Sequence, residues 1–339
     1  MRAKNGCPNL RDVAKAAGVG STTVSRVING GHYVAPEVLA RVRKVMKDLG
    51  FEPNEAARSL KSDRTRTIGL IIPSITDPFF AHIAAVAEAF ARQRDHVLIL
   101  LTSGDQEKLE IDDLRVFERH RTDGLLLVPP RSQSKSLLDC LRRLSVPIVS
   151  IDRPLTKCSS VICDNREAAH KAVQHLIAHG RRRILCLGGD PRLYTIRERV
   201  KGYTSAVVSA GLEILIDMEA ADYPSAEKIV LKRMAQESGI DAVFGLYNQS
   251  TIHTYEVLRN HRIPVPKRIS IVGFDDFSLA SSLRPSITVV QQGVKEIARA
   301  ATQLLFDHIS GEADAPRQIE VGSTLIIRQS CGCPLQRKD

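Results

Sequence analysis

The chain has 339 residues, of which 43% are hydrophobic and 25% charged, a composition typical of a globular protein with two or three compact units. Its longest apolar runs are far too short to span a membrane, which excludes a membrane protein. The net charge is +10, and +7 of it lies in residues 1–66, where 13 Lys and Arg face 6 Asp and Glu. This excess indicates contact with a polyanion at that end, with a solvated basic arm as the alternative.

The first predicted elements are two short helices joined by a glycine turn. Apolar residues repeat at i, i+3, i+4 and i+7 from Leu10 to Ala17, Gly18 ends that helix, and Ser21 starts the next. A third helix is expected from Pro36, and three helices with this turn match a helix-turn-helix. The expected buried residues are Leu10, Val13, Ala14 and Ala17, then Val24, Val27 and Ile28, then Leu39, Val42, Met46 and Leu49.

The second helix carries a polar face made of Ser21, Thr22, Ser25, Arg26 and Asn29. Small hydroxyls let a helix enter a DNA major groove, and the forked guanidinium of Arg26 suits a guanine edge. A small helical bundle with a polar surface is the alternative. Because a glycine precedes Ser21, this serine has two expected roles, reading a base or capping the helix.

The next segment, PNEAARSLKSDRTRT at 53–67, predicts a helix of about eight residues with Ala56, Ala57 and Leu60 on one side. A helix this short is not stable alone in water. It therefore needs a partner, which is a second copy of the chain, DNA, or both.

From residue 66 onward, short apolar runs alternate with helix-length amphipathic segments, which predicts parallel sheets covered on both faces. The length of about 270 residues suggests two such lobes, with a ligand bound between them at the carboxyl ends of the strands. The predicted strands are 67–72, 96–100, 123–128, 147–151, 183–187, 241–246, 269–274 and 286–290.

Two stretches, LRDVAKAAGVGSTTVSRVING at 10–30 and GFEPNEAARSLKS at 50–62, resemble the DNA-binding head and hinge of the LacI family of transcriptional regulators. The resemblance continues nearly end to end through IIPSITDPFFAHI, PIVSIDRP, RERVKGYTSA, ISIVGFDD and LIIRQS. It implies an all-α helix-turn-helix head with a hinge helix, followed by a two-lobed α/β effector domain like the periplasmic sugar-binding proteins.

The resemblance also implies where the domains begin and end. The head is expected over 1–61, with the hinge helix at about 53–61, and the effector and dimerisation domain over 62–339. The N-lobe is expected at about 66–161 and 291–321, and the C-lobe at about 162–290 and 322–339. In the family a hinge leucine wedges into the minor groove and kinks the operator. The matching residue is Leu60, with Asn54, Ala57 and Arg58 beside it.

Effector contacts are likewise implied by the resemblance. Arg199 and Asp275 match a family arginine and its acidic counterpart, which suit a polyhydroxylated ligand, although a structural ion pair is the alternative for each. Asp152 matches a cleft carboxylate. The remaining implied contacts are Asp77, Phe79, Phe80, Tyr223, Tyr247, Asn248 and Gln292.

One position departs from the family pattern. Where relatives usually have Asn-Asp after a strand, this chain has Tyr247-Asn248, so an amide replaces a carboxylate and a phenol enters the cleft rim. We take this as a hypothesis that the ligand is more anionic, such as a sugar acid.

The predicted function is a sequence-specific DNA-binding regulator, a repressor, controlled by a sugar, sugar acid or related metabolite and bound as a homodimer to an inverted-repeat operator. Two alternatives remain: a regulator of the same fold controlled by a partner protein, and an α/β enzyme with a DNA-binding head. The second lacks support because GxxxxGK[ST], GxGxxG and GxSxG are absent.

No cofactor, catalytic residue or metal site is expected. His82, His170 and His175 fall on predicted helices without a metal-ligand grouping, and no histidine follows Cys331-Gly332-Cys333. The seven scattered cysteines and the missing signal peptide predict reduced thiols and a cytoplasmic protein. Only nine residues follow Ser330, without leucine heptads, so a dimer is expected rather than a tetramer.

Overall fold

The structure is a computed structural model that describes residues 8–29, 34–51, 65–131, 133–313 and 315–333. It divides into two units, 1–65 and 66–339. The hinge helix expected at about 53–61, with Asn54, Ala57, Arg58 and Leu60, lies outside the described residues. In the part of the chain that is described, no helix is long and apolar enough to cross a membrane.

The described residues of the first unit form three helices, α1 (Leu10–Ala17), α2 (Ser21–Asn29) and α3 (Pro36–Leu49). A reciprocal capping box starts α1: the Asn9 side chain accepts from the backbone N–H of Asp12 at 3.3 Å, and the Asp12 carboxylate accepts from that of Asn9 at 2.9 Å. Gly18 ends α1 in the left-handed region at φ +66°, which glycine adopts without strain. The chain therefore turns sharply into α2, as the sequence predicts.

Five fully buried side chains form the core of this unit, and Val24 and Val42 come from α2 and α3. The expectation for α3 was partly wrong. Leu49, the last residue of α3, is 39% exposed, and Val38 and Val45 pack on the core together with Met46. Val38, Val42 and Val45 are spaced i, i+4, i+7, so they share the helix face that the predicted set missed.

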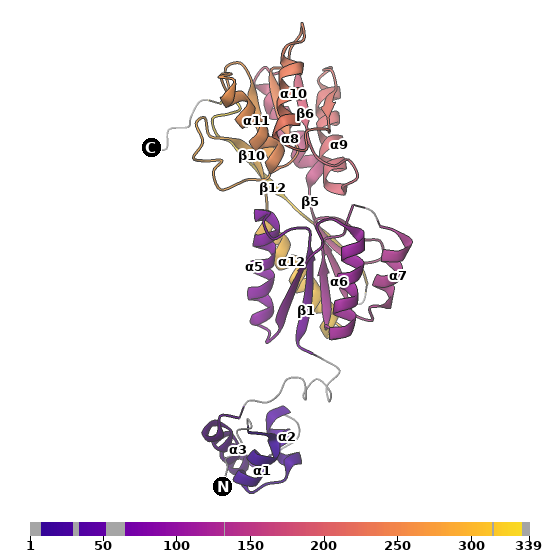
Figure 1. The fold of residues 1–339 in the computed structure, drawn as a ribbon, viewed down its shortest axis with the longest axis vertical. Coiled ribbons are helices and arrows are strands. Elements are labelled where there is room, and N and C mark those ends of the chain that lie inside the picture. Colours follow the sequence, from indigo (N-terminus) through magenta and orange to yellow (C-terminus); the bar gives the residue numbers. More distant parts are fainter. Residues whose placement is uncertain (1–7, 30–33, 52–64, 132, 314, 334–339) are drawn as a thin grey trace. The chain divides into compact units, whose positions relative to one another are not determined.

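The second unit contains two six-stranded sheets (Figure 1). The first has the order β11-β5-β4-β3-β1-β2 and is parallel throughout. Its strands are β1 (Thr67–Ile72), β2 (Val97–Thr102), β3 (Gly124–Leu127), β4 (Ile148–Ile151), β5 (Ser159–Cys163) and β11 (Gln318–Val321).

The second sheet has the order β12-β10-β9-β8-β6-β7, and only the β10–β12 pair is antiparallel. Its strands are β6 (Ile184–Leu187), β7 (Leu215–Asp217), β8 (Ala242–Gly245), β9 (Ser270–Phe274), β10 (Thr288–Gln292) and β12 (Ser323–Ile326).

Helices cover both faces of each sheet, which is why most strands are continuously apolar. In the first sheet, Ile68, Leu70 and Ile72 point toward α5 (Pro78–Arg92) and α12 (Val294–Ser310), whereas Ile71 packs toward α6 (Glu107–His120) and α7 (Lys135–Arg143). The second sheet packs between α8 (Asn165–Ala178) with α9 (Tyr194–Ser209) and α10 (Tyr223–Met234) with α11 (Asn248–Asn260).

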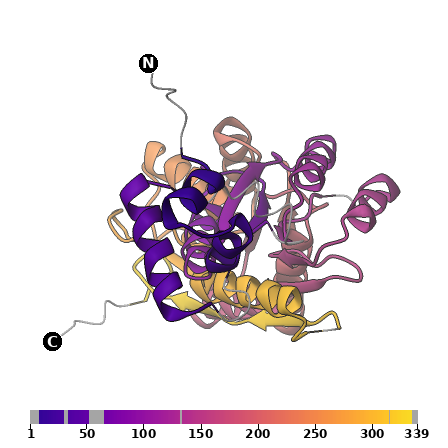
Figure 2. The same ribbon diagram turned by 90° about the horizontal axis from the view of Figure 1, so that it is seen from below.

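The chain passes between the two sheets three times. After β5 it enters the second sheet's layer at α8, after β10 it returns to the first at α12, and between β11 and β12 it crosses again. Thus α12, drawn in yellow, packs beside α5 although more than 200 residues separate them (Figure 1; Figure 2). The first two crossings follow residues 163 and 292, two residues later than the expected lobe boundaries.

Candidate functional site

The first candidate site is the outer face of α2. Ser21, Thr22 and Arg26 are exposed there, and Ser25 is half-buried. The backbone carbonyl of Gly20 accepts from the N–H groups of the residues at 23 and 24, so Gly20 holds the N-cap position and Ser21 is the first helical residue. The cap position therefore falls to Gly20 and not to Ser21. Asn29 ends α2, and its side chain lies outside what the structure describes.

The second candidate site is a cavity of about 580 Å³ lined from both sheets. Its walls come from the segments that directly follow strands: 73–80 after β1, Asp105 after β2, Arg131 after β3, and 152–153 after β4. From the second sheet come 189–196 after β6, Met218 and Ala221 after β7, Tyr247 after β8, Asp275 after β9 and Gln292 at the end of β10. The carboxyl ends of both sheets thus face one cavity, as expected for this class of fold.

Arg199, on α9, is held by several partners in the cavity wall, and only 3% of it is exposed. Its Nε donates to Asn165 Oδ1 at 2.8 Å, and its Nη1 donates to the Leu246 carbonyl at 2.8 Å and to Asp275 Oδ2 at 3.1 Å. The guanidinium also lies 3.7 Å from the centre of the Phe274 ring. Nη2 takes no part in these three bonds, so a rigidly oriented donor is left to the cavity.

Asp275 links Arg199 to a third cavity residue. Gln292 Nε2 donates to Asp275 Oδ1 at 2.6 Å, while Arg199 occupies Oδ2. Gln292 Oε1 is buried and has no hydrogen-bond partner among the described residues. The Arg199–Asp275 pair expected from the sequence is therefore present, and Gln292, which is hydrogen-bonded to it, offers an unpaired acceptor.

Two further carboxyl groups lie in the cavity wall, each in a poorly solvated environment. Burial raises the pKa of Asp152 to about 6, although nearby Arg153 and Arg199 oppose that shift. Burial also raises the pKa of Asp77. The Phe79 N–H, which donates to Asp77 Oδ1 at 3.0 Å at the start of α5, opposes this shift. The structure thus brings together carboxyl groups that would repel one another if all were ionised.

Comparison with known proteins identifies the two units. The profile of bacterial regulatory proteins, lacI family, matches residues 9–54, and that of the periplasmic binding protein-like domain matches 173–331. The HTH-type transcriptional repressor PurR of Photobacterium profundum is 31% identical over 328 residues, which cover 95% of this chain and 98% of that protein. The chain belongs to the LacI family.

Solved structures of LacI-family proteins have the same architecture. The transcriptional regulator CelR–cellobiose complex is 30% identical, with a TM-score of 0.71 over 95% of this chain and 99% of that one. The lac repressor dimer bound to operator and the anti-inducer ONPF is 21% identical, with a TM-score of 0.86 over 96% and 99%. The expected helix-turn-helix head and two-lobed α/β domain are thus confirmed.

Two of the contacts carried over from the LacI family do not line the cavity. Tyr223 begins α10, where its hydroxyl donates to Glu227 Oε1 at 2.9 Å and accepts from Asn260 Nδ2 at 2.9 Å. Asn248 begins α11 and is 7% exposed, with its Oδ1 accepting from the backbone N–H of Gln249. The other eight expected contacts all line it: Asp77, Phe79, Phe80, Asp152, Arg199, Tyr247, Asp275 and Gln292.

Several lining residues were missed by sequence reasoning, and the arginines are the most informative. Arg153 is ion-paired with Asp105 and donates to the Pro129 carbonyl at 2.8 Å. Arg131 is 3.0 Å from Asp190, which comes from the other sheet's side of the cavity. These four charged residues (105, 131, 153 and 190) each follow a strand. The rule that ligands bind at the carboxyl ends of parallel strands could therefore have identified them.

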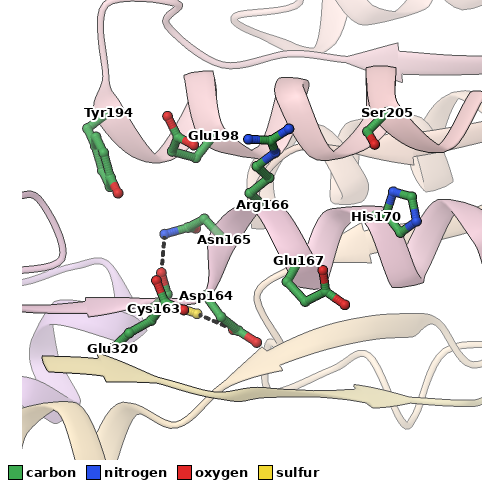
Figure 3. A pocket seen from close by; sticks show the side chains of 10 residues that line it. All are labelled: Cys163, Asp164, Asn165, Arg166, Glu167, His170, Tyr194, Glu198, Ser205 and Glu320. Atoms are coloured by element: carbon green, nitrogen blue, oxygen red, sulfur yellow. Dashed lines mark hydrogen bonds between the residues drawn. The ribbon is translucent and has the colours of Figure 1, made fainter. Parts of the chain in front are cut away.

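A separate pocket of about 470 Å³ lies beside α8 and α9 and includes Glu320 of β11 (Figure 3). It contains none of the effector contacts expected for this LacI-family chain. Asn165 lines it and also accepts from Arg199, which lines the effector cavity.

Proposed function

We propose that this protein is a transcriptional repressor whose affinity for operator DNA is set by a neutral polyhydroxylated ligand, such as a sugar, bound between the two lobes. The observation that carries this proposal is the fixed Arg199–Asp275–Gln292 group in a cavity walled by the carboxyl ends of both sheets. Rigid charged donors and acceptors suit ring hydroxyls, which both donate and accept hydrogen bonds.

The charge of the cavity argues for a neutral ligand over a sugar acid. The described residues that line it include five aspartates (77, 105, 152, 190 and 275) and three arginines (131, 153 and 199). An added carboxylate would meet this acidic excess, whereas hydroxyl donors find acceptors, among them the unpaired Gln292 Oε1. The anionic-ligand hypothesis rested partly on Asn248, whose side chain is turned to its own helix. Cellobiose in the CelR complex supports a sugar ligand here.

Phe79 and Phe80 supply the apolar surface that a sugar ring needs. Their rings meet edge to face at 5.1 Å, Phe80 is buried in the lobe core, and Phe79 is half-buried at the cavity wall. Phe80 therefore supports Phe79, whose free surface is the candidate for covering the apolar face of the ring.

Control of DNA binding follows from lobe geometry. A ligand that contacts both sheets has different affinities for different lobe arrangements, and this difference is the free energy that couples the cleft to the head. We propose that two copies act together in the cytoplasm on an inverted-repeat operator, because a symmetric dimer presents two α2 helices to matching half-sites.

The cavity gives no support to an enzyme. The described residues that line it include no histidine or cysteine. Ser74, a possible nucleophile, has its hydroxyl 2.8 Å from the Thr76 hydroxyl, which is not a base. We therefore propose binding without catalysis.

The test uses the full-length protein in two steps. DNA selected from a random pool should yield an inverted repeat, and fluorescence anisotropy on that site should then respond to a neutral sugar. A response to sugar acids alone would overturn the neutral-ligand assignment, and a response to neither would favour control by a partner protein. Failure to select any specific sequence would contradict the regulator itself.

A matched pair of variants localises the response. Asp275→Asn removes the charge that Arg199 and Gln292 share, so it should weaken ligand binding by at least about tenfold, since hydrogen bonds to charged groups contribute roughly 1.5–3 kcal/mol. Glu213→Gln removes an exposed partner of Arg183 in the same lobe and should change nothing. Equal ligand affinity in Asp275→Asn and the unmodified chain would exclude this site.

A further inference from the structure

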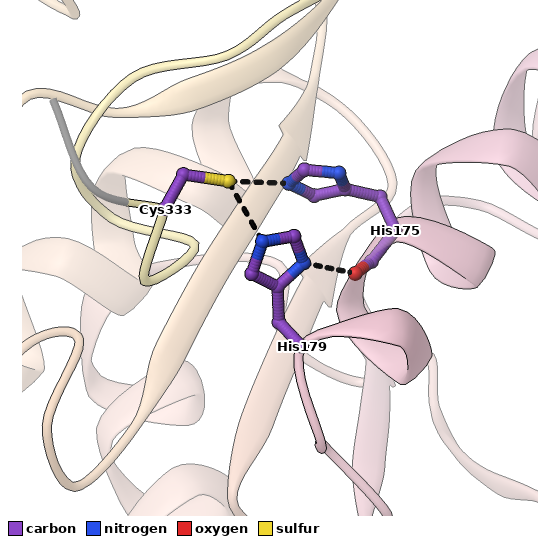
Figure 4. Close-up of side chains that lie close together, drawn as sticks. All are labelled: His175, His179 and Cys333. Atoms are coloured by element: carbon purple, nitrogen blue, oxygen red, sulfur yellow. Dashed lines mark hydrogen bonds between the residues drawn. The ribbon is translucent and has the colours of Figure 1, made fainter. Parts of the chain in front are cut away.

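Three metal-ligating side chains lie together on the outer side of the second sheet, away from the effector cavity. Cys333 Sγ is 3.4 Å from His175 Nε2 and 2.9 Å from His179 Nε2 (Figure 4). All three ligand atoms lie within 4.8 Å of one another. The expectation that His175 has no metal-ligand grouping is therefore wrong. His175 and His179 precede Cys333 by more than 150 residues. The expectation from the sequence considered only a histidine after the cysteines, so it could not identify them.

The two histidines present their rings from one face of α8. They are four residues apart, so successive turns stack them, with ring centroids 4.4 Å apart. His179 Nδ1 donates to the backbone carbonyl of His175 at 2.8 Å. Because Nδ1 carries the proton, Nε2 keeps its lone pair, and that lone pair faces the thiol. This is the arrangement in which an outer hydrogen bond orients a metal-binding imidazole.

Cys331 anchors the turn that carries Cys333. It is fully buried, and Ser270 Oγ donates to its backbone carbonyl at 3.0 Å, which fixes the start of the turn. Its own Sγ donates to the Arg328 carbonyl at 3.4 Å and is not one of the three ligand atoms that lie together. Gly332 follows at φ +97°, a conformation that suits glycine, and the chain then places Cys333 against the end of α8.

We propose that His175, His179 and Cys333 bind one Zn²⁺ ion, with a solvent molecule completing the tetrahedron. Zinc–nitrogen bonds of about 2.0–2.1 Å and zinc–sulfur bonds of about 2.3 Å require sulfur-to-nitrogen separations of roughly 3.5 Å. The His175 separation already meets this value, and His179, the exposed residue that directly follows α8, needs only a small outward movement. A thiolate and two imidazoles are donors that zinc prefers, and binding releases the thiol proton of Cys333 to solvent.

The site would join two parts of the chain that no strand pairing connects. Cys333 follows β12, whereas the two histidines lie at the end of α8, and the other end of α8 carries Asn165, which holds Arg199. Zinc would therefore link the segment after β12 to the helix that leads to the effector cavity.

The experiment uses the full-length protein, reduced and stripped with a chelator. Titration with Zn²⁺ against a chromophoric chelator should give one equivalent bound per chain. Titration with Co²⁺ should produce the intense visible bands of tetrahedral cobalt together with thiolate charge transfer in the near ultraviolet. Zinc should also raise the melting temperature, because a ligand that binds only the folded chain stabilises it.

The variants Cys333→Ser and His179→Gln change partly or fully exposed positions, so both should fold. Each should weaken zinc binding by at least roughly tenfold and abolish the melting shift. The matched controls are His170→Gln, on α8, and Cys158→Ser, a half-buried cysteine directly before β5; both should bind like the unmodified chain. The proposal is overturned if the reduced protein binds less than one equivalent, if Cys333→Ser binds equally well, or if Cys331 and Cys333 form a disulfide in place of a metal site.

Discussion

Arg26 stands on the exposed face of α2 among small hydroxyl side chains, which leaves its guanidinium free to approach a base edge. Arg26→Ala should relax base preference more than it weakens overall DNA binding, costing about 1–3 kcal/mol at the selected site. Anisotropy titrations on the selected site and on random DNA measure the two effects. Equal losses on both would mean that Arg26 contacts phosphate and reads no base.

Glu110 is a residue that sequence reasoning did not single out. It lies on α6 with 0% exposure, and both carboxyl oxygens lack a hydrogen-bond partner among the described residues. Burial raises its pKa from 4.5 to about 9, although Arg153 opposes the shift. The folded chain therefore keeps Glu110 protonated at neutral pH.

This proton has a measurable effect on stability. Because the folded chain holds it more tightly than the unfolded chain does, the free energy of unfolding should fall as the pH rises between about 4.5 and 9. Glu110→Gln stays neutral in both states, so the variant should match the unmodified chain near pH 4.5 and exceed it by about 3 kcal/mol at pH 7. Urea unfolding at several pH values tests this, and a difference between the two chains that does not vary with pH would contradict it.

At the scale of elements, α11 is set against the second sheet by a close contact. A Cβ at Gly273 on β9 would lie 2.6 Å from Cγ2 and 2.9 Å from Cβ of Thr251, which is fully buried. The Thr251 hydroxyl in turn donates to the carbonyl of Tyr247, a residue that lines the effector cavity. The glycine therefore determines how closely a cavity residue can approach the sheet.

Gly273→Ala should lower the free energy of unfolding by about 1–3 kcal/mol, the usual cost of overpacking a core. Thr251→Ala removes Oγ1 and Cγ2, so in a double-mutant cycle the pair should lose less than the sum of the two single variants. Additive losses would show that the strain is relieved elsewhere.

The sequence predicted eight of the twelve strands that the structure describes and missed β5, β7, β11 and β12. Apolar runs such as 67–72 predicted β1 because buried parallel strands read as continuous hydrophobic segments. The missed strands carry no such run: β7 has only three residues, and β5, β11 and β12 have no more than two apolar residues in succession before a polar or cysteine residue or the strand end. For the cavity, family resemblance supplied eight lining residues. It missed Arg131 and Arg153, whose roles depend on partners distant in the chain.

At the scale of the whole molecule, the resemblance makes the hinge the link between sensor and DNA. Leu60→Ala should reduce operator affinity and operator bending, because an apolar wedge that unstacks a base step is lost. The body should keep its melting temperature, since the substitution lies outside the unit that begins at residue 66. A gel assay with circularly permuted operator fragments measures the bend, and an unchanged bend would contradict the assignment.

The crossings between the two sheets have a consequence for how the protein is made. The head has its own core within residues 10–51, whereas the first sheet gains its edge strand only at residues 318–321 and the second only at 323–326. Since a chain leaves the ribosome from its N-terminus, the head can fold early in translation, while both lobes wait for residues 318–326. A premature stop codon anywhere in the body would thus remove both halves of the sensor at once and release a head that no ligand can control.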